Sequence, residues 1–253
     1  MIEPTDPRSR RRWFSILALL ALCCAVFPPL AAGEPLRLNT GVGAPYIQPD
    51  KKGFLDRLVP EVFRRLGIQA EAVVYPASER ANMNANNGLD DGVAMRVKGL
   101  EAAYPNLVRV EEKVADNDFV AYSGHHVFAT TGFEALTPYQ VGYIAGWKVF
   151  EPRLKDGYAV TLVQDADQLF NLLANDRADV VLFERWQGNW LVRERRQKAK
   201  LLLPPLVSTE MFMYLHKKHA HLAGPAAQAL RAMKADGTYR RLVEENLRVS
   251  DPR

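Results

Sequence analysis

The chain has 253 residues, 48% of them hydrophobic, with 33 basic and 29 acidic side chains and a formal net charge of +4. This length and balance predict a globular protein large enough for two lobes. No long basic block is interleaved with aromatic residues, so nucleic acid is not an expected partner. The densest basic cluster, residues 193–200, contains Glu194 and Gln197 and is typical of a solvated helix end.

Residues 1–33 have the pattern of a secretory signal peptide. Four arginines precede an apolar run at 13–26, and the small residues Ala31, Ala32 and Gly33 follow. The run is shorter than the roughly 20 apolar residues of a membrane span, although an uncleaved anchor is the alternative. We therefore expect export to the periplasm, by the general secretory route rather than the twin-arginine route, because Arg11-Arg12 matches the twin-arginine signal only loosely.

Both cysteines, Cys23 and Cys24, lie inside this predicted leader. The mature chain then has no disulfide, no thiolate nucleophile and no cysteine-bound metal. The first 32 residues also carry four basic and two acidic side chains, so the net charge of +4 falls to +2 in the mature chain.

Strands and helices are expected to alternate in the first half of the mature chain. Apolar runs predict strands at 35–40, 70–75, 92–95 and 119–122, and helical spacing predicts helices at 55–66 and 80–87. Pro60 falls inside the first helix, which should therefore begin late, near Leu58, or kink.

The second half continues the alternation. Strands are expected at 141–144, 160–163, 180–183, 201–203 and 211–215, and helices at 149–154, 167–175 and 226–233. A short amphipathic stretch, 242–247, comes last. Between the final two helical segments, Gly237 suits a helix end that needs positive φ, and Thr238 can cap the next helix.

This alternation predicts an α/β protein with mostly parallel sheets covered by helices. Two such blocks indicate two lobes, with the chain crossing between them near residues 122–126 and 206–210. The C-terminal helices would then return to the first lobe.

Motifs for catalysis and metal binding are missing from the sequence. It has no Gly-x-Ser-x-Gly elbow, no phosphate-binding loop and no His-Glu-x-x-His pair, and Gly41-Val42-Gly43 lacks the third glycine of a dinucleotide site. His216, His219 and His221 have a spacing that could hold a metal, but a surface loop is the expected role. We expect no cofactor and no metal.

Four segments resemble family 3 extracellular solute-binding proteins, the polar-amino-acid-binding type. The first is the ending Lys-Ala-Asp-Gly-Thr-Tyr at 234–239, flanked by helices. The others are Gly-Phe-Leu-Asp-Arg-Leu at 53–58, Gly-Tyr-Ile-Ala-Gly at 142–146 and Ala-Asp-Val-Val-Leu-Phe-Glu at 178–184. The resemblance extends from residue 36 to about residue 247 and is typical of a divergent branch.

The resemblance implies a type II periplasmic-binding-protein fold, with a cleft that closes on a small solute. One lobe would comprise residues 34–124 and 208–253, and the other residues 125–207. It also implies a monomer that captures a small polar solute, an amino acid or related carboxylate, for an inner-membrane ABC-type permease or a sensor.

Arginines are the candidates for an anionic end of the solute, because a guanidinium matches a carboxylate with two parallel N–H groups. The family clamps a carboxylate with an arginine in the region of Arg96; the alternative is an ion pair with Asp90, Asp91 or Glu101. Arg80 is the second candidate, and its alternative is a solvated helix start.

The resemblance places four further residues in the cleft. Tyr46 would lie over the ligand, or be a turn aromatic. Gly146 would offer a backbone N–H at a helix start, and Trp147 would stack on the ligand or pack between helix and sheet. Glu184 would hold an ammonium group, or pair with Arg185 or Arg153.

Two other functions remain open. An enzyme on the same scaffold, similar to cyclohexadienyl dehydratases, would use Glu184 as a general acid with a raised pKa. An orphan or sensory binding protein would lack a dedicated transporter. We expect binding rather than catalysis.

Overall fold

The computed structural model describes residues 34–75 and 78–248. The predicted signal peptide lies outside the described residues and stays a prediction. Within the described part, no helix has the length and apolar character that crossing a bilayer requires. The strands of this part form one eight-stranded sheet in the order β2-β1-β3-β8-β4-β7-β5-β6.

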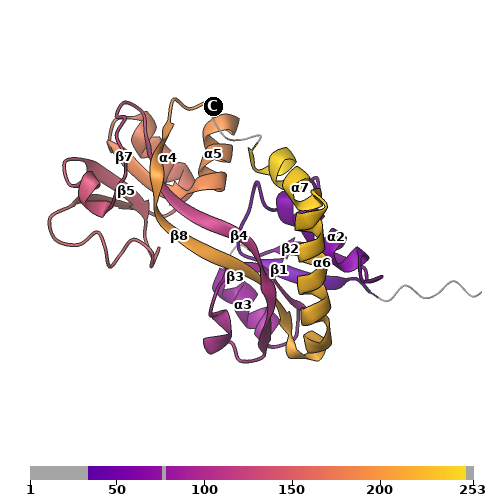
Figure 1. Ribbon diagram of the computed structural model, residues 1–253. Coiled ribbons are helices and arrows are strands. Elements are labelled where there is room, and N and C mark those ends of the chain that lie inside the picture. The colour runs from indigo at the N-terminus through magenta and orange to yellow at the C-terminus, as the bar shows by residue number, and fades with distance from the viewer. Residues whose placement is uncertain (1–33, 76–77, 249–253) are drawn as a thin grey trace, which may run out of the picture. The chain divides into compact units, whose positions relative to one another are not determined.

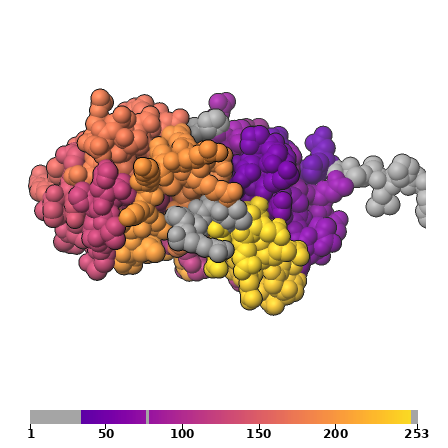
Figure 2. Space-filling view, turned by 90° about the horizontal axis from the view of Figure 1, so that it is seen from above, coloured from indigo at the N-terminus to yellow at the C-terminus, as the bar shows by residue number. Residues whose placement is uncertain are grey.

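The N-terminal half of the sheet is built on parallel pairing. β1 pairs with both β2 and β3 in parallel. The elements of this half are β1 (Leu36–Thr40), α2 (Phe54–Arg64), β2 (Ala70–Val74), α3 (Ser78–Asn86) and β3 (Gly92–Val97), with α6 (Ala223–Ala235) and α7 (Thr238–Asn246) returning to it. α6 packs against α2, α7 and the long strand β4 (Figure 1), and the C-terminal helices adjoin the N-terminal residues in Figure 2.

Helix α2 begins before Leu58 and continues through Pro60, so the expectation of a late start is wrong. The start is fixed by the carboxylate of Asp56, whose Oδ2 accepts hydrogen bonds from the backbone N–H of Gly53 at 3.0 Å and of Gln48 at 2.8 Å. A carboxylate in the first turn satisfies donors that the helix cannot pair itself.

The other half of the sheet repeats the arrangement. β5 (Gln140–Ile144) pairs in parallel with β6 (Ala159–Val163) and with β7 (Val180–Glu184). The helices are α4 (Ala166–Ala174) and α5 (Arg185–Glu194). The sequence indicates only the end of α5, at the basic cluster 193–200, because the interior of this helix contains Gly188, a poor helix former. A Cβ there would lie 2.5 Å from the hydroxyl of Tyr122, so the close approach of helix and strand explains the glycine.

Two long antiparallel strands, β4 (Leu107–Ser123) and β8 (Lys200–His216), run side by side through both halves (Figure 1). The two strands expected at 201–203 and 211–215 are therefore one. The sequence suggested a break because Pro204 and Pro205 cannot donate to a ladder. Both fall where the register shifts, between the pairs Phe119–Val207 and Ala121–Leu202, so their missing N–H groups interrupt no regular pairing.

Each long strand changes core along its length. Val110 and Val114 of β4 pack in the N-terminal core, whereas Val120 and Tyr122 pack in the other. The change along β4 thus comes earlier than the crossing expected near residues 122–126. The division into lobes at 34–124 with 208–253, and 125–207, remains a proposal.

The helix expected at 149–154 is replaced by a series of turns after Trp147. Backbone hydrogen bonds from Phe150 to Trp147 at 2.9 Å and from Leu154 to Phe150 at 3.1 Å hold it together. Pro152 has no N–H to continue a helical ladder, which accounts for the difference. Three short 3-10 helices complete the described elements: Leu100–Ala102, Phe133–Leu136 and Lys217–Leu222.

The joint between α6 and α7 confirms the prediction for Gly237, whose φ is 82°. The capping role expected of Thr238 is wrong. Thr238 is the first residue of α7, and its N–H donates to Oδ1 of Asp236 at 2.9 Å.

We expect Gly237→Ala to lower the free energy of unfolding by about 1 kcal/mol, because L-residues resist positive φ. Nothing lies within 4 Å of the Cβ that the substitution would add, so backbone strain is the sole cause. Gly224 in α6 has equally open space without positive φ, and Gly224→Ala is the matched control, with unchanged or slightly raised stability. Equal effects of the two substitutions in urea unfolding would contradict this account.

Candidate functional site

A cleft of about 850 Å³ is lined by residues from both halves of the sheet and from the long strands that join them. The N-terminal half contributes Gly41, Val42, Ser78, Arg96 and Val97; the long strands contribute Asn117, Phe119, Val207, Thr209 and Met211; the other half contributes residues 146–149, Arg153, Glu184 and Gln187. Two smaller cavities, of about 310 and 270 Å³, contain none of the candidate residues.

Strand β3 places Arg96 on the N-terminal wall of this cleft. The side chain is partly buried, and its Nε donates to Oδ1 of Asn82 at 3.2 Å. Burial lowers the pKa of Arg96, while Tyr104 and Glu79 act in the opposite direction. An arginine stays charged in a protein, so the wall carries a cation drawn partly out of water.

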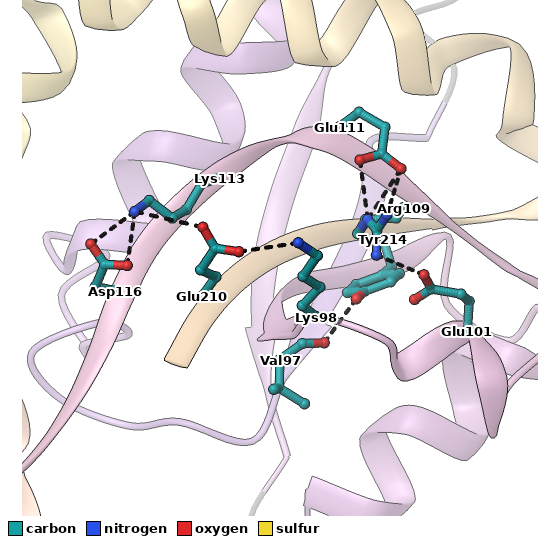
Figure 3. A network of polar contacts seen from close by, with 9 residues as sticks. All are labelled: Val97, Lys98, Glu101, Arg109, Glu111, Lys113, Asp116, Glu210 and Tyr214. Carbon is teal, nitrogen blue, oxygen red and sulfur yellow. Dashed lines mark hydrogen bonds and ion pairs between the residues drawn. The ribbon is translucent and has the colours of Figure 1, made fainter. Parts of the chain in front are cut away.

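The three carboxylates proposed as alternative partners of Arg96 are engaged elsewhere. Asp90 accepts a hydrogen bond from Asn39 at 2.8 Å, Asp91 pairs with Lys218 at 2.8 Å, and Glu101 pairs with Arg109 at 2.7 Å. Figure 3 shows the last pair and, as a separate group, the ion pairs that join Lys98, Glu210, Lys113 and Asp116. Among residues 34–75 and 78–248, no carboxylate lies within 4.0 Å of the Arg96 guanidinium. Arg96 is thus a cleft cation without an ionic partner in the described chain.

Glu184 ends β7 and caps α5, and its side chain is 2% exposed. Its Oε1 accepts hydrogen bonds from the hydroxyl of Tyr46 and the backbone N–H of Trp186, both at 3.1 Å. Its Oε2 accepts from the backbone N–H of Gln187 at 2.8 Å. The N–H groups are those that a helix start leaves unpaired, so Glu184 stabilises α5 as well as lining the cleft.

Burial raises the pKa of Glu184 to about 7, and the three hydrogen bonds oppose that rise. Neither alternative arginine forms the pair considered from the sequence. Arg185 lies beside Asp118, with Nη1 3.7 Å from Oδ2, and Arg153 donates to the backbone oxygen of Val149 at 2.7 Å. Glu184 is therefore held by neutral donors.

Tyr46 lies behind the cleft wall, 1% exposed, with its ring edge-on to Phe54 at 6.3 Å. Burial and the neighbouring Glu184 raise the pKa of Tyr46 well above its ordinary value, so its hydroxyl remains a donor. Its contact with the cleft is the hydrogen bond to Glu184.

We expect Tyr46→Phe to lower the free energy of unfolding by about 1–2 kcal/mol, because Glu184 loses a buried donor. The same loss should raise the pKa of Glu184 further, since the Tyr46 hydrogen bond lowers it. Tyr143→Phe is the matched control, because Tyr143 is 4% exposed and its hydroxyl makes no hydrogen bond to another described residue. Denaturant unfolding at pH 7 that finds equal losses for the two variants would show that the Tyr46 hydroxyl contributes nothing.

Gly146 and Trp147 line the other wall. The Gly146 N–H, considered for anion binding, donates to Oε1 of Glu151 at 3.0 Å, and the helix expected to follow it does not form. Trp147 stacks on Phe183 at 5.0 Å and on Phe150 at 5.9 Å. These contacts favour a packing role for most of the indole, with its remaining surface in the cleft.

Arg80 in α3 is exposed and is not among the residues lining the cleft. The solvated position considered for it from the sequence fits this placement. The residue is useful as a control, because it has the same charge as Arg96 and lies outside the cleft wall.

Sequence reasoning missed several lining residues, including Asn117, Phe119 and Thr209 on the long strands. The i, i+2 spacing of Asn117 and Phe119 is the signal that could have placed them on one face. Because the strand expected from the sequence begins only at residue 119, it does not include Asn117. Arg153 was considered only as a partner of Glu184.

Two of the three C-terminal histidines lie against other groups. His219 lies 2.8 Å from Oδ1 of Asp91, and His216 lies against Gly88. In the described part of the chain, no cluster of three or more His, Cys, Asp or Glu side chains could hold a metal ion.

No family model matches the sequence. An uncharacterized protein of Shewanella oneidensis is 25% identical over 189 residues, which cover 72% of this chain and 71% of that protein. This similarity says nothing about the activity of either protein.

Solved structures share the fold. The second substrate-binding domain of a putative amino acid ABC transporter from Streptococcus pneumoniae matches with a TM-score of 0.67, 18% identity, and coverage of 85% of this chain and 100% of that one. The GluR0 ligand-binding core from Nostoc punctiforme, in complex with L-glutamate, matches with a TM-score of 0.66, 18% identity, and coverage of 86% and 100%. A histidine kinase sensor domain with similarity to periplasmic binding proteins matches with a TM-score of 0.66, 14% identity, and coverage of 85% and 97%. These neighbours confirm the expected α/β fold, which this chain shares with a substrate-binding domain, a ligand-binding core and a sensor domain.

Proposed function

We propose that this protein is a periplasmic solute-binding protein that captures a small polar solute, an amino acid or a related carboxylate, in the cleft. Arg96 binds the carboxylate, and the wall containing Gly146, Trp147 and Glu184 closes over the solute. Tyr46 supports Glu184 from behind. Solute contacts with both walls would favour a closed arrangement of the two lobes.

The observation that carries this proposal is the unpaired guanidinium of Arg96 in a cleft of about 850 Å³ lined from both halves of the fold. A partly buried cation without an ionic partner is costly unless an anion joins it. A solute carboxylate would satisfy it with a charge-assisted, two-pronged hydrogen bond.

The partner that receives the solute belongs to the same proposal. An inner-membrane ABC permease fits the fold shared with transporter domains, and a sensor fits the fold shared with a histidine kinase sensor domain. The predicted leader supports a periplasmic location. We propose the protein acts as a monomer.

A thermal-shift screen of the purified protein against amino acids, small organic acids and polyamines tests the proposal. A solute at 100 times its Kd should stabilise the folded state by about 2.7 kcal/mol. We expect at least one carboxylate to raise the melting temperature. The absence of any hit among carboxylates, with hits confined to polyamines, would contradict the proposal.

The geometry around Glu184 gives little support to the alternative function, a dehydratase-like enzyme. Its general acid would be Glu184, whose raised pKa suits that role, but the carboxyl is almost fully buried and engaged by three donors. We therefore treat the protein as a binding protein.

A further inference from the structure

The charges on the cleft wall are mostly positive. Four lining residues are ionisable: Arg96, Lys148, Arg153 and Glu184. Lys148 is neutralised locally, because its Nζ lies 2.9 Å from Oε2 of Glu151. Among the described lining residues, two arginines therefore remain without an ionic partner: Arg96, which is partly buried, and Arg153, which is exposed to solvent.

Arg153 lies on the wall opposite Arg96. Its Nη1 donates to the backbone oxygen of Val149 at 2.7 Å, and its guanidinium carbon lies 5.8 Å from the ring centre of Phe133. In the described chain, no carboxylate comes within 4.0 Å of this guanidinium. Its position is fixed by neutral groups, and most of its five N–H donors remain for a ligand.

Arg96, on the N-terminal wall, is likewise held by a neutral group and not by a carboxylate of the described chain. One N–H donates to Asn82, and the other guanidinium donors meet no acidic partner among the described residues. Each half of the fold thus contributes to the cleft one guanidinium that has no acidic partner among the described residues.

An ammonium group finds no comparable partner. Among the described residues that line the cleft, Glu184 is the one acidic residue, and it already accepts hydrogen bonds from Tyr46, Trp186 and Gln187. A carboxylate offers about four acceptor positions, so little capacity is left for a ligand donor. Its burial also favours the neutral form, which attracts a cation less.

We infer that the solute is a dicarboxylate without an ammonium group, with one carboxylate on Arg96 and the other on Arg153. This inference rests on the proposed function, because it names the ligand class of the same cleft. A dianion would join the two walls through charge-assisted hydrogen bonds at both ends. A single carboxylate would leave one guanidinium facing the enclosed solute.

The test is a calorimetric titration of the purified protein with four acids of equal length: pentanoate, 2-aminopentanoate, glutarate and L-glutamate. These probes vary the second carboxylate and the α-ammonium group independently. The set is repeated at seven and nine carbons, because the length that fits depends on the separation of the arginines. We expect the dicarboxylate to bind about tenfold or more tightly than the monocarboxylate. The α-ammonium group should weaken binding in both pairs.

Titrations of the Arg153→Gln variant test whether Arg153 binds the second carboxylate. This variant should bring the affinity for the dicarboxylate to about that for the monocarboxylate, because the second carboxylate loses its partner. Arg80→Gln, which removes an equal charge outside the cleft wall, should change neither. Equal loss in the Arg80 and Arg153 variants would show a general charge effect and overturn the assignment of Arg153.

Failure of this inference is distinct from failure of the proposed function. If amino acids or monocarboxylates bind as tightly as dicarboxylates in an Arg96-dependent manner, the protein is a solute-binding protein and the dicarboxylate inference is wrong. If no acid in the screen or in this series binds, the proposed function fails as well.

Discussion

Arg96→Gln should lower the affinity for the solute found in the screen by about a hundredfold, or roughly 3 kcal/mol. Glutamine stays polar, but it is shorter and supplies neither the charge nor two parallel N–H groups. Because Arg96 has no ionic partner within the described residues, the substitution should leave the free energy of unfolding unchanged or slightly raised. A specific loss of binding without a loss of stability is the signature of a ligand-binding arginine.

Calorimetry and urea unfolding of Arg96→Gln and the control Arg80→Gln measure the two effects. The control should bind as the unmodified protein does, because Arg80 is exposed and lies outside the cleft lining. Retention of affinity within about threefold in Arg96→Gln would exclude Arg96 as the carboxylate-binding residue.

The second large effect concerns Glu184 and pH. Burial raises its pKa from the ordinary 4.5 to about 7 in the folded protein. Between these values the folded state holds a proton that the unfolded chain releases. The free energy of unfolding therefore falls as pH rises through this window, by roughly 3 kcal/mol in total. This contribution is fully present below about pH 4.5 and is lost above about pH 7.

Glu184→Gln isolates this contribution, because its amide does not titrate. We expect the difference in unfolding free energy between the unmodified protein and Glu184→Gln to decrease from pH 4.5 to pH 8. Urea unfolding of both proteins across this range separates Glu184 from other titrating groups, which are shared. A difference that stays constant with pH would mean that Glu184 remains ionised in the folded protein.

The sequence predicts most of the fold because its signals are local. Apolar residues at helical spacing in α2 are buried together, and the continuous apolar run of β7 is a strand buried along its length. Gly237 is recognisable at the joint of two helices from its residue type alone, because glycine tolerates the positive φ that the joint needs. Such signals depend on neighbours in the sequence.

Each misplaced element contains a proline or a glycine whose effect is not evident from its neighbours in the sequence. Pro204 and Pro205 indicate the end of a strand, but they lie at a register shift in β8, where their missing N–H groups interrupt no regular pairing. Gly188 makes α5 hard to predict, because the glycine is needed for close packing against Tyr122, which lies on a strand distant in sequence. Apolar spacing suggested a helix at 149–154, where Pro152 limits the chain to turns.

The candidate site could be predicted only in part. Arg96 and Glu184 line the cleft near the ends of β3 and β7, two strands that the sequence pattern predicts. Their partners are not visible. Tyr46 reaches Glu184 from 138 residues away, and the acidic neighbours of Arg96 in sequence pair with other residues in space. The same limit concealed Arg153 as a second cleft cation.

A crystal structure of the protein with its tightest-binding acid from the screen tests the central claim most directly. We expect one acid in the cleft that is lined by both halves of the sheet, with a carboxylate in two-pronged contact with the guanidinium of Arg96. An acid bound elsewhere, with Arg96 still lacking an anionic partner, would contradict it.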